Sequence, residues 1–302
     1  MQTHASDPTF SVVIPAYNAE RTLRAALASV LAQTEQDFEI IIVDDGSTDN
    51  TLEIANSAAD QDPRIKVISG ANKGAAGARN AGIAAAAGNL VAFLDADDVW
   101  LPRKLEKQLE AFGSGQGVRS VRCGACLVDD DLKVMSRRPC HESDDVLMEI
   151  LLFRNTSPWM STLVVERTAF AEIGMFDTTL AMIEDWEFAI RLARLGPMKS
   201  VEEPLAYYRQ HPGNRSKDWQ AHIRSGFQVL DKLFLDSSLP SHVRKERSKI
   251  YSKFYLMLSG AALAGSARTE AVKWGIKAVF THPGSLGYIL SLPGRRLKRD
   301  SN

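Results

Sequence analysis

Hydrophobic and amphipathic stretches alternate along the first third of the chain. Runs of apolar and β-branched residues predict four strands, at 11–14, 38–43, 65–69 and 90–94. Apolar residues at helical spacing predict three helices between them, at 23–31, 52–58 and 77–87. The run at 38–43 is almost unbroken, as expected for a strand that is buried on both faces. This alternation predicts a mostly parallel sheet covered by helices.

The pattern changes beyond residue 100. A helix is predicted at 101–112 and a Gly-rich joint at 113–117. Further strands are predicted at 118–128, 160–166 and 198–210, and further helices at 144–153 and 184–195. After the His-Pro-Gly turn at 211–213 the pattern is helical to the end. The sequence therefore predicts a flexible N-terminus at 1–9, an α/β domain at 10–213 and a helical region at 214–302.

Polar residues follow three of the predicted strands at the points where the strands end. The first strand runs into a Pro-Ala-Tyr-Asn turn at 15–18, the second into Asp44 and Asp45, and the fourth into an acidic run at 95–98. In open sheets of this kind, ligands bind beyond the carboxyl ends of the strands. Three separate strands therefore bring polar groups to one edge, which predicts a binding site there.

The acidic run places three carboxylates within four positions, at Asp95, Asp97 and Asp98. Like charges this close repel one another unless a cation lies among them. Their oxygen ligands suit Mg2+ or Mn2+, which usually bind through one or two carboxylates together with substrate phosphates. A solvated acidic turn that caps the next helix is the alternative, because Asp is favoured at helix N-caps.

Five segments, at 11–18, 40–49, 72–80, 93–98 and 183–187, resemble in this order the motifs of the family 2 glycosyltransferases. The resemblance covers residues 10–212 and implies the GT-A fold. This is an α/β fold with a Rossmann-like, mostly parallel sheet that is flanked by helices. In this chain it would form a catalytic domain, followed by a helical C-terminal extension. It also implies an inverting transferase that moves a sugar from a nucleotide-diphosphate sugar to a hydroxyl of a glycan or lipid-linked saccharide. The expected donor is a UDP-sugar. Mn2+ or Mg2+ is the implied cofactor, because a divalent ion stabilises a departing diphosphate.

The same resemblance assigns roles to individual residues. Asp185 corresponds to the general base, and Asp97 and His211 correspond to contacts of the metal ion. The positions that correspond to the nucleotide-sugar site are Pro15, Ala16, Tyr17, Asp45, Lys73, Arg79, Asp95 and Ala96. Among them, Asp45 would accept a nucleobase N–H, and Tyr17 would stack in the wall of the base pocket.

Several of these roles have a structural alternative. Tyr17 could be a half-buried turn aromatic, and Lys73 and Arg79 could be solvated side chains. His211 could be a packed histidine rather than a ligand. Asp185 could be only a favourable charge in the first turn of its helix, where the helix N-terminus stabilises the ionised form in either case.

Composition narrows the class of protein. The chain has 302 residues, a 45% hydrophobic content and a formal net charge of −1, values that are typical of a soluble globular protein. No apolar run approaches the ~18 residues of a membrane-spanning helix, and residues 1–10 lack the features of a secretory signal. The expected location is therefore the cytoplasm, and no nucleic-acid partner is expected.

Cys123 and Cys126 form a C-x-x-C, with Cys140 nearby. They lie in a predicted strand, where positions three apart point to opposite faces. Gly124 would permit a turn between them. Reduced thiols are nevertheless expected rather than a zinc site.

The small net charge hides an asymmetry. Residues 241–302 contain twelve Lys or Arg and three Asp or Glu, a net charge of +9, so the first 240 residues carry −10. The region also has apolar positions at helical spacing, Val272, Ile276 and Phe280, and a last basic cluster within 295–299. Two interpretations stay open: peripheral contact with an anionic membrane at its inner face, or a solvated helical cap whose apolar faces pack on the catalytic domain.

The sequence disfavours two alternatives to the transferase. A nucleotidyltransferase would carry a Gly-rich, basic loop near the N-terminus, whereas residues 15–22 hold one Arg and no Gly. A catalytically inactive sugar-nucleotide-binding protein would be expected to lack an acid at position 97 or 185, and Asp97 and Asp185 are both present.

Overall fold

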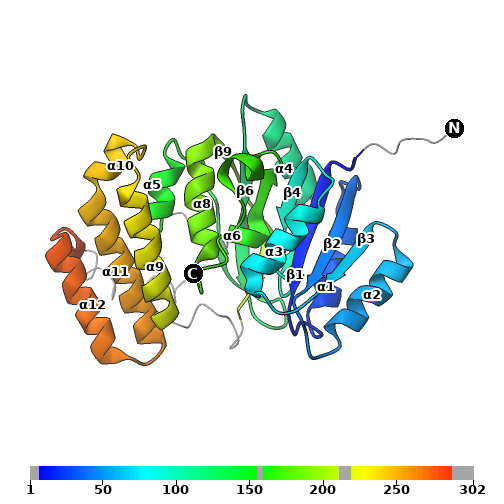
Figure 1. Ribbon diagram of the computed structural model, residues 1–302, viewed down its shortest axis with the longest axis horizontal. Helices are drawn as coiled ribbons and strands as arrows, with labels where there is room; N and C mark the ends of the chain where they lie inside the picture. The colour runs from blue at the N-terminus through cyan, green and yellow to red at the C-terminus, as the bar shows by residue number, and fades with distance from the viewer. Residues whose placement is uncertain (1–6, 155–158, 211–218, 288–302) are drawn as a thin grey trace. The chain divides into compact units, whose positions relative to one another are not determined.

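The computed structural model of the chain describes residues 7–154, 159–210 and 219–287 (Figure 1). The chain divides into two compact units. The first comprises Met1–Ile150, Asn155–Thr179 and Glu184–Pro212, and the second comprises Leu151–Arg154, Leu180–Ile183 and Gly213–Asn302. Two short segments from within the predicted α/β domain thus belong to the second unit.

Four parallel strands form one half of the sheet in the first unit. They lie in the order β3 (Ile65–Ser69), β2 (Phe38–Asp44), β1 (Phe10–Ala16) and β4 (Leu90–Phe93). β1 pairs with β2 on one side and with β4 on the other, so the chain crosses from one side of β1 to the other between β3 and β4. At such a switch point the carboxyl ends of the strands leave a crevice for ligands.

The other half of the sheet contains antiparallel pairs. β8 (Leu163–Glu166) runs antiparallel to β4, and the sheet continues through β6 (Ser120–Val128), β9 (Met198–Arg209) and β5 (Val99–Trp100). β7 (Val134–Arg138) pairs with β6. Because β8 opposes β4 in direction, the beginning of β8 lies beside the end of β4.

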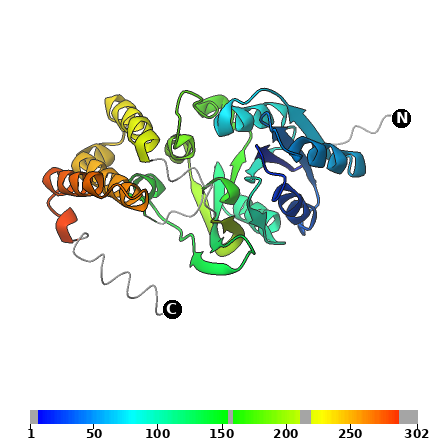
Figure 2. The ribbon, with the colours of Figure 1, turned by 90° about the horizontal axis from the view of Figure 1, so that it is seen from below.

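Helices cover both faces of this sheet. The core of one face contains residues of α1 (Leu23–Leu31), α2 (Thr51–Gln61) and α4 (Lys104–Gly113), and the other contains residues of α3 (Gly74–Ala85), α7 (Ala169–Ile173) and α8 (Glu184–Leu195). Figure 2 shows α1 in dark blue and α3 in cyan on opposite sides of the strands. Along β1, Val12 and Ile14 belong to the first core and Val13 to the second, because successive side chains of a strand point to opposite faces.

The predicted β-α-β alternation through residue 94 is confirmed, with ends shifted by a few residues. The predicted strand at 160–166 was wrong at its start, because Trp159–Thr162 forms the short helix α6 and only Leu163–Glu166 pairs in the sheet. The helix predicted at 144–153 is the shorter α5 (Val146–Leu151). β5, β7 and α7 were not predicted, because β5 has only two residues, β7 lacks an apolar run, and α7 has only five residues, too few to show a helical period.

The sequence suggested that the first strand ends at Pro15, but the structure differs. β1 continues to Ala16, and Pro15 pairs in register with Val43 of β2. The pairing with β4 stops at Val13. Pro15 therefore has a strand neighbour on one side only, and the loss of its N–H removes no hydrogen bond to β4.

Helices make up most of the second unit: α9 (Trp219–Leu235), α10 (Ser241–Lys245), α11 (Arg247–Ala264) and α12 (Arg268–Thr281). Rings from three of them pack together, namely Phe227, Phe254, Tyr255 and Trp274. Gly226 leaves room for this cluster, since a Cβ there would lie 2.0 Å from the Phe254 ring. Across the described ranges of both units, none of the helices combines the length and the hydrophobicity that crossing a bilayer requires.

Candidate active site

The ends of β1 and β2 are held together at the carboxyl edge of the sheet. Ala16 pairs in register with Asp44, and the Asp45 N–H donates to the Ala16 carbonyl at 2.9 Å. Asn18, which has a φ of 50°, accepts the Thr48 N–H on its Oδ1 at 2.9 Å. The two turns that follow the strands are therefore hydrogen-bonded to one another.

Asp45 is buried beside the start of α3. Its Oδ1 accepts the backbone N–H of Lys73 at 2.7 Å, while the Lys73 side chain is exposed. Within the described residues the other oxygen, Oδ2, has no hydrogen-bond partner. The carboxylate is thus fixed at one oxygen, and the second can accept a hydrogen bond from a ligand.

The three residues that end the first motif differ in exposure. Pro15 is half-buried, Ala16 is buried, and Tyr17 is 52% exposed. About half of the surface of Tyr17 is therefore accessible to solvent.

The acidic run at 95–98 forms a tight turn after β4, closed by the Asp98 N–H, which donates to the Asp95 carbonyl at 3.0 Å. Asp95 and Asp97 are half-buried, and Ala96 and Asp98 are buried. Burial raises the pKa of Asp98 well above its ordinary value, and the charges of Asp97 and Asp95 raise it further. Asp98 does not cap the next helix, since α4 begins at Lys104.

Two residues that the motifs did not indicate hold this turn in place. The Ser161 hydroxyl donates to Asp98 Oδ2 at 2.5 Å and accepts the Asp95 N–H at 3.1 Å. The Arg209 N–H donates to Asp98 Oδ1 at 3.0 Å, and Arg209 Nε donates to the Asp97 carbonyl at 2.9 Å. Ser161 precedes β8 and Arg209 ends β9, so both depend on the pairing of distant strands.

Asp185 lies in the first turn of α8, where it is half-buried. Burial raises its pKa and so does the neighbouring Glu184 carboxylate, whereas the positive charge of Arg79 opposes both. The pKa of Asp185 is raised overall, whereas a helix N-terminus alone would lower it. A carboxylate with a raised pKa accepts a proton more readily, which suits a general base.

Arg79 connects the acidic turn to α8. Its Nη2 donates to Asp95 Oδ1 at 2.8 Å and its Nη1 to Glu184 Oε1 at 3.1 Å, and only 7% of the side chain is exposed. Its guanidinium carbon lies 5.5 Å from the centre of the Phe176 ring. Burial lowers the pKa of Arg79, but the Asp95 and Glu184 carboxylates outweigh this and raise it. Arg79 is therefore neither solvated nor turned toward open space, and its charge is shared between two acids.

The acidic turn fits a divalent cation. Within the described residues no three His, Cys, Asp or Glu side chains form a ready-made metal cluster, and His211 lies outside these residues. However, Asp95 and Asp97 are close enough to raise the pKa of Asp98, so negative charge accumulates at this turn. A cation held by Asp97, with Asp95 beside it and phosphate oxygens completing its shell, would offset that charge.

The cysteines lie apart from this chemistry. Cys123, Cys126 and Cys140 are free and buried. Burial raises the pKa of Cys123 to about 12. Its thiol is therefore protonated at neutral pH.

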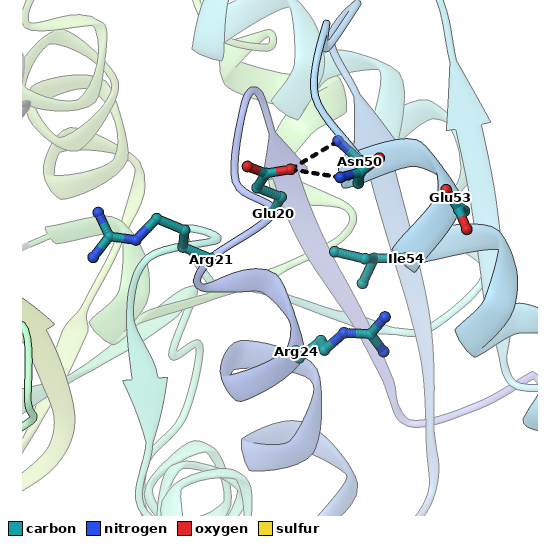
Figure 3. Close-up of a pocket in the computed structure, with 6 residues that line it drawn as sticks. All are labelled: Glu20, Arg21, Arg24, Asn50, Glu53 and Ile54. Carbon is teal, nitrogen blue, oxygen red and sulfur yellow. Dashed lines mark hydrogen bonds between the residues drawn. The ribbon is translucent and has the colours of Figure 1, made fainter.

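A shallow hollow of about 610 Å³ lies where α1 and α2 begin (Figure 3). Its lining comprises Glu20, Arg21, Arg24, Asn50, Glu53 and Ile54. Glu20 Oε2 accepts hydrogen bonds from both the backbone N–H and the side-chain amide of Asn50. None of the predicted site residues lines this hollow.

Comparison with known proteins decides the family. A family model described as glycosyl transferase family 2 matches residues 11–169. The chain belongs to glycosyltransferase family 2. An uncharacterized glycosyltransferase of Nostoc sp. is 41% identical to it over 240 residues, which cover 75% of this chain and 74% of the relative. Family membership makes the chain a glycosyltransferase, as the order of the motifs predicted.

Two named relatives are also similar to this family 2 glycosyltransferase. The amylovoran biosynthesis glycosyltransferase AmsB of Erwinia amylovora is 35% identical over 70% of this chain and 75% of its own length. The UDP-Glc:alpha-D-GlcNAc-diphosphoundecaprenol beta-1,3-glucosyltransferase WfgD of Escherichia coli is 44% identical over 108 residues, which cover 34% of this chain and 40% of WfgD.

Solved structures confirm the fold prediction. Residues 1–349 of S. aureus TarS, determined with UDP-GlcNAc, match with a TM-score of 0.60 at 18% identity, covering 90% of this chain and 91% of TarS 1–349. The mannosyltransferase PcManGT of Pyrobaculum calidifontis, determined with GDP-Man and Mn2+, matches with a TM-score of 0.61 at 17% identity, covering 96% of this chain and 83% of PcManGT. This family 2 glycosyltransferase therefore has the GT-A fold, with a helical C-terminal region.

Proposed function

We propose that this glycosyltransferase is an inverting, metal-dependent enzyme that moves a sugar from a UDP-sugar to a saccharide hydroxyl, with Asp185 as the base. The observation that carries the proposal is the position of Arg79, which ion-pairs with Asp95 of the acidic turn and with Glu184, the residue before Asp185. One buried side chain therefore spans the distance between the proposed donor acids and the proposed base. We assign the catalytic domain to 10–213 and the C-terminal extension to 214–302.

The donor assignment rests on Asp45 and Tyr17. A buried carboxylate with one unbonded oxygen can accept the ring N–H of uracil, and the exposed Tyr17 ring can stack on the base. Thymine offers the same N–H, so dTDP-sugars are the next donors to test. Pro15 and Ala16 would complete the wall of the base pocket, and Lys73, Arg79, Asp95 and Ala96 would border the rest of the donor.

The metal ion, Mn2+ or Mg2+, would be held by Asp97 and His211 together with phosphate oxygens of the donor. When bound, it supplies a positive charge that stabilises the diphosphate as the bond to the sugar breaks. Asp98, held by Ser161 and Arg209, would keep Asp97 in place. The Mn2+ in the PcManGT structure supports this assignment by likeness of fold.

Inversion follows from a single displacement. The acceptor oxygen forms the new bond to the anomeric carbon, the bond to the phosphate oxygen breaks with its electron pair on the nucleoside diphosphate, and Asp185 takes the acceptor proton. No protein nucleophile is needed. The raised pKa of Asp185 favours this proton transfer.

The proposed acceptor is a growing glycan or a lipid-linked saccharide of the cell envelope. The names of AmsB and WfgD support it, because the first concerns the biosynthesis of amylovoran and the second a diphosphoundecaprenol-linked sugar. The location that goes with such an acceptor is the cytoplasm, at the inner face of the membrane.

The test is a screen of UDP-, dTDP- and GDP-sugars for hydrolysis and transfer with Mn2+. UDP-sugars should react fastest, and excess chelator should stop the reaction. Asp97→Asn should weaken Mn2+-linked binding of UDP, whereas Asp60→Asn, which removes an exposed acid at the end of α2, should leave it unchanged. Full activity of Asp97→Asn would contradict the metal assignment, and release of pyrophosphate from a nucleoside triphosphate would favour a nucleotidyltransferase.

A further inference from the structure

α12 exposes a stripe of large apolar side chains. Val272, Ile276 and Phe280 are 62%, 53% and 84% exposed. They are spaced four residues apart, so they lie along one face of the helix. Burying these three side chains elsewhere would be favourable, because it would remove their apolar surface from water.

The opposite face of α12 packs on α11 through two small residues and the Trp274 ring, which stacks on Tyr255. Ala271 and Ala278 are buried, and their carbonyls accept hydrogen bonds from Ser259 at 2.7 Å and Ser252 at 2.8 Å of α11. The two serines therefore fix the rotation of α12. The helix cannot turn its large apolar residues inward without breaking both hydrogen bonds.

Basic residues border the apolar stripe. Arg268 and Lys273 are exposed, and Lys273 forms a surface ion pair with Glu270. Lys277, also exposed, lies 4.8 Å from the centre of the Tyr255 ring. The surrounding region, 241–302, has a net charge of +9. An apolar stripe bordered by Lys and Arg is typical of a helix that lies in the interface of an anionic bilayer.

We propose that α12 is a membrane-docking helix that inserts Val272, Ile276 and Phe280 into the interface of an anionic lipid bilayer. The charge of residues 241–302 favours this occupant, because a region with a net charge of +9 is attracted to anionic lipid headgroups and repels a second copy of itself. This inference rests on the proposed function in one respect, since it would bring the enzyme to a lipid-linked acceptor.

The experiment is cosedimentation of the full chain with vesicles of phosphatidylcholine alone and of phosphatidylcholine mixed with phosphatidylglycerol. Binding should require phosphatidylglycerol and should weaken at high salt, because salt screens the electrostatic attraction. Equal binding to both kinds of vesicle, or no binding to either, would overturn the proposal.

A variant that carries Val272→Gln, Ile276→Gln and Phe280→Gln tests the stripe itself. All three side chains are exposed, so the fold should be kept, and binding should fall by at least about tenfold, since burial of one such side chain already corresponds to that factor. The matched control is Leu235→Gln at the end of α9, which removes a side chain that is also 84% exposed and should bind as the wild type does. Equal loss in both variants would show that the stripe has no specific role.

Two further measurements separate this proposal from its rivals. Sedimentation without lipid reports the oligomeric state, and a dimer that the triple variant dissociates would assign the stripe to a second copy of the chain instead. Hydrolysis of the UDP-sugar by the triple variant should equal that of the wild type. Normal hydrolysis with lost vesicle binding supports the docking helix, whereas vesicle binding without any hydrolysis would contradict the proposed function alone.

Discussion

Arg79 and Glu184 are 105 positions apart in the chain and form a buried ion pair, with Nη1 3.1 Å from Oε1. The same guanidinium also holds Asp95 at 2.8 Å. Its charge counteracts the burial and the Glu184 carboxylate that raise the pKa of Asp185. The proton affinity of the proposed base therefore depends on a residue of a different helix.

Arg79→Lys should lower turnover by about tenfold or more, since a compact ammonium cannot hold two carboxylates with the fork of a guanidinium. The weaker pairing should raise the pKa of Asp185 further and move the acidic limb of the pH profile of kcat to higher pH. Arg64→Lys is the matched control, because Arg64 pairs with Asp62 at 2.7 Å and contacts none of the proposed site residues. An unchanged acidic limb in Arg79→Lys would show that Arg79 has a structural role only.

Asp185→Asn should reduce transfer by ~100-fold or more, the effect expected when a general base is removed. The amide cannot take the acceptor proton, but it leaves the donor site intact, so the Kd of the UDP-sugar should change little. Transfer rates and calorimetric titration of the donor measure the two effects separately. Glu53→Gln, which changes an acid in the first turn of α2, is the control, and transfer near the wild-type rate in both variants would assign Asp185 to charge placement at its helix.

Asp45→Asn should change base preference. The Asn carbonyl can still accept the Lys73 N–H, but the amide group would then replace the carboxylate oxygen that is proposed to accept the uracil N–H. We expect UDP to bind about tenfold or more weakly, because two donors would face each other, and CDP, which offers an acceptor at that ring position, to gain relative to UDP. Competition of UDP and CDP against a fluorescent nucleotide measures this, and an unchanged ratio of their Kd values would remove Asp45 from base recognition.

The sequence predicted the parts of the site that follow directly from strand ends. Asp45 and Asp95 come immediately after apolar runs, and parallel strands bring such ends to one edge of a sheet. Ser161 and Arg209 could not be found in this way, since their contacts with Asp98 span 63 and 111 positions and depend on how β8 and β9 join the sheet. No local pattern distinguishes them from ordinary polar residues.

The direction of the pKa shift at Asp185 could also not be predicted from the sequence. Its place at a helix N-terminus predicts a stabilised charge, but desolvation and Glu184 outweigh that effect once the helix is packed. The burial of Arg79 could not be predicted either, because it also depends on packing. A side chain that could have been solvated is 7% exposed because α3 packs against the sheet beside two acids.

Lys104 provides a test of the packing in the first unit. It is fully buried, its Nζ donates to Gln108 Oε1 at 2.6 Å and lies 4.0 Å from the centre of the Trp100 ring, and burial lowers its pKa to about 8. Between about pH 8 and the ordinary Lys pKa of about 10.4, the unfolded state therefore binds more protons than the folded state, so the free energy of unfolding should rise with pH by up to about 3 kcal/mol. Lys104→Met should lack this rise.

Urea unfolding of the wild type and of Lys104→Met from about pH 7 to about pH 10 measures the contribution of Lys104 as the difference between their free energies of unfolding. Comparing the variant with the wild type at each pH removes the contributions of other titrating groups. A difference that does not change over this range would show that Lys104 reaches water in the folded state.

The contacts of Asp98 limit how this protein can be recombined with its relatives. The segment up to residue 100 contains most of the residues proposed for the donor, which suggests exchanging the remainder of the chain to obtain a new acceptor. Asp98, however, is bonded to Ser161 and Arg209, and both would be replaced in such an exchange. A chimera that lacks the Ser161 hydroxyl would leave the buried Asp98 carboxyl group without that hydrogen bond, and one that lacks the Arg209 side chain would lose the hydrogen bond to the Asp97 carbonyl. Residues 98, 161 and 209 of a chimera must therefore come from the same parent protein.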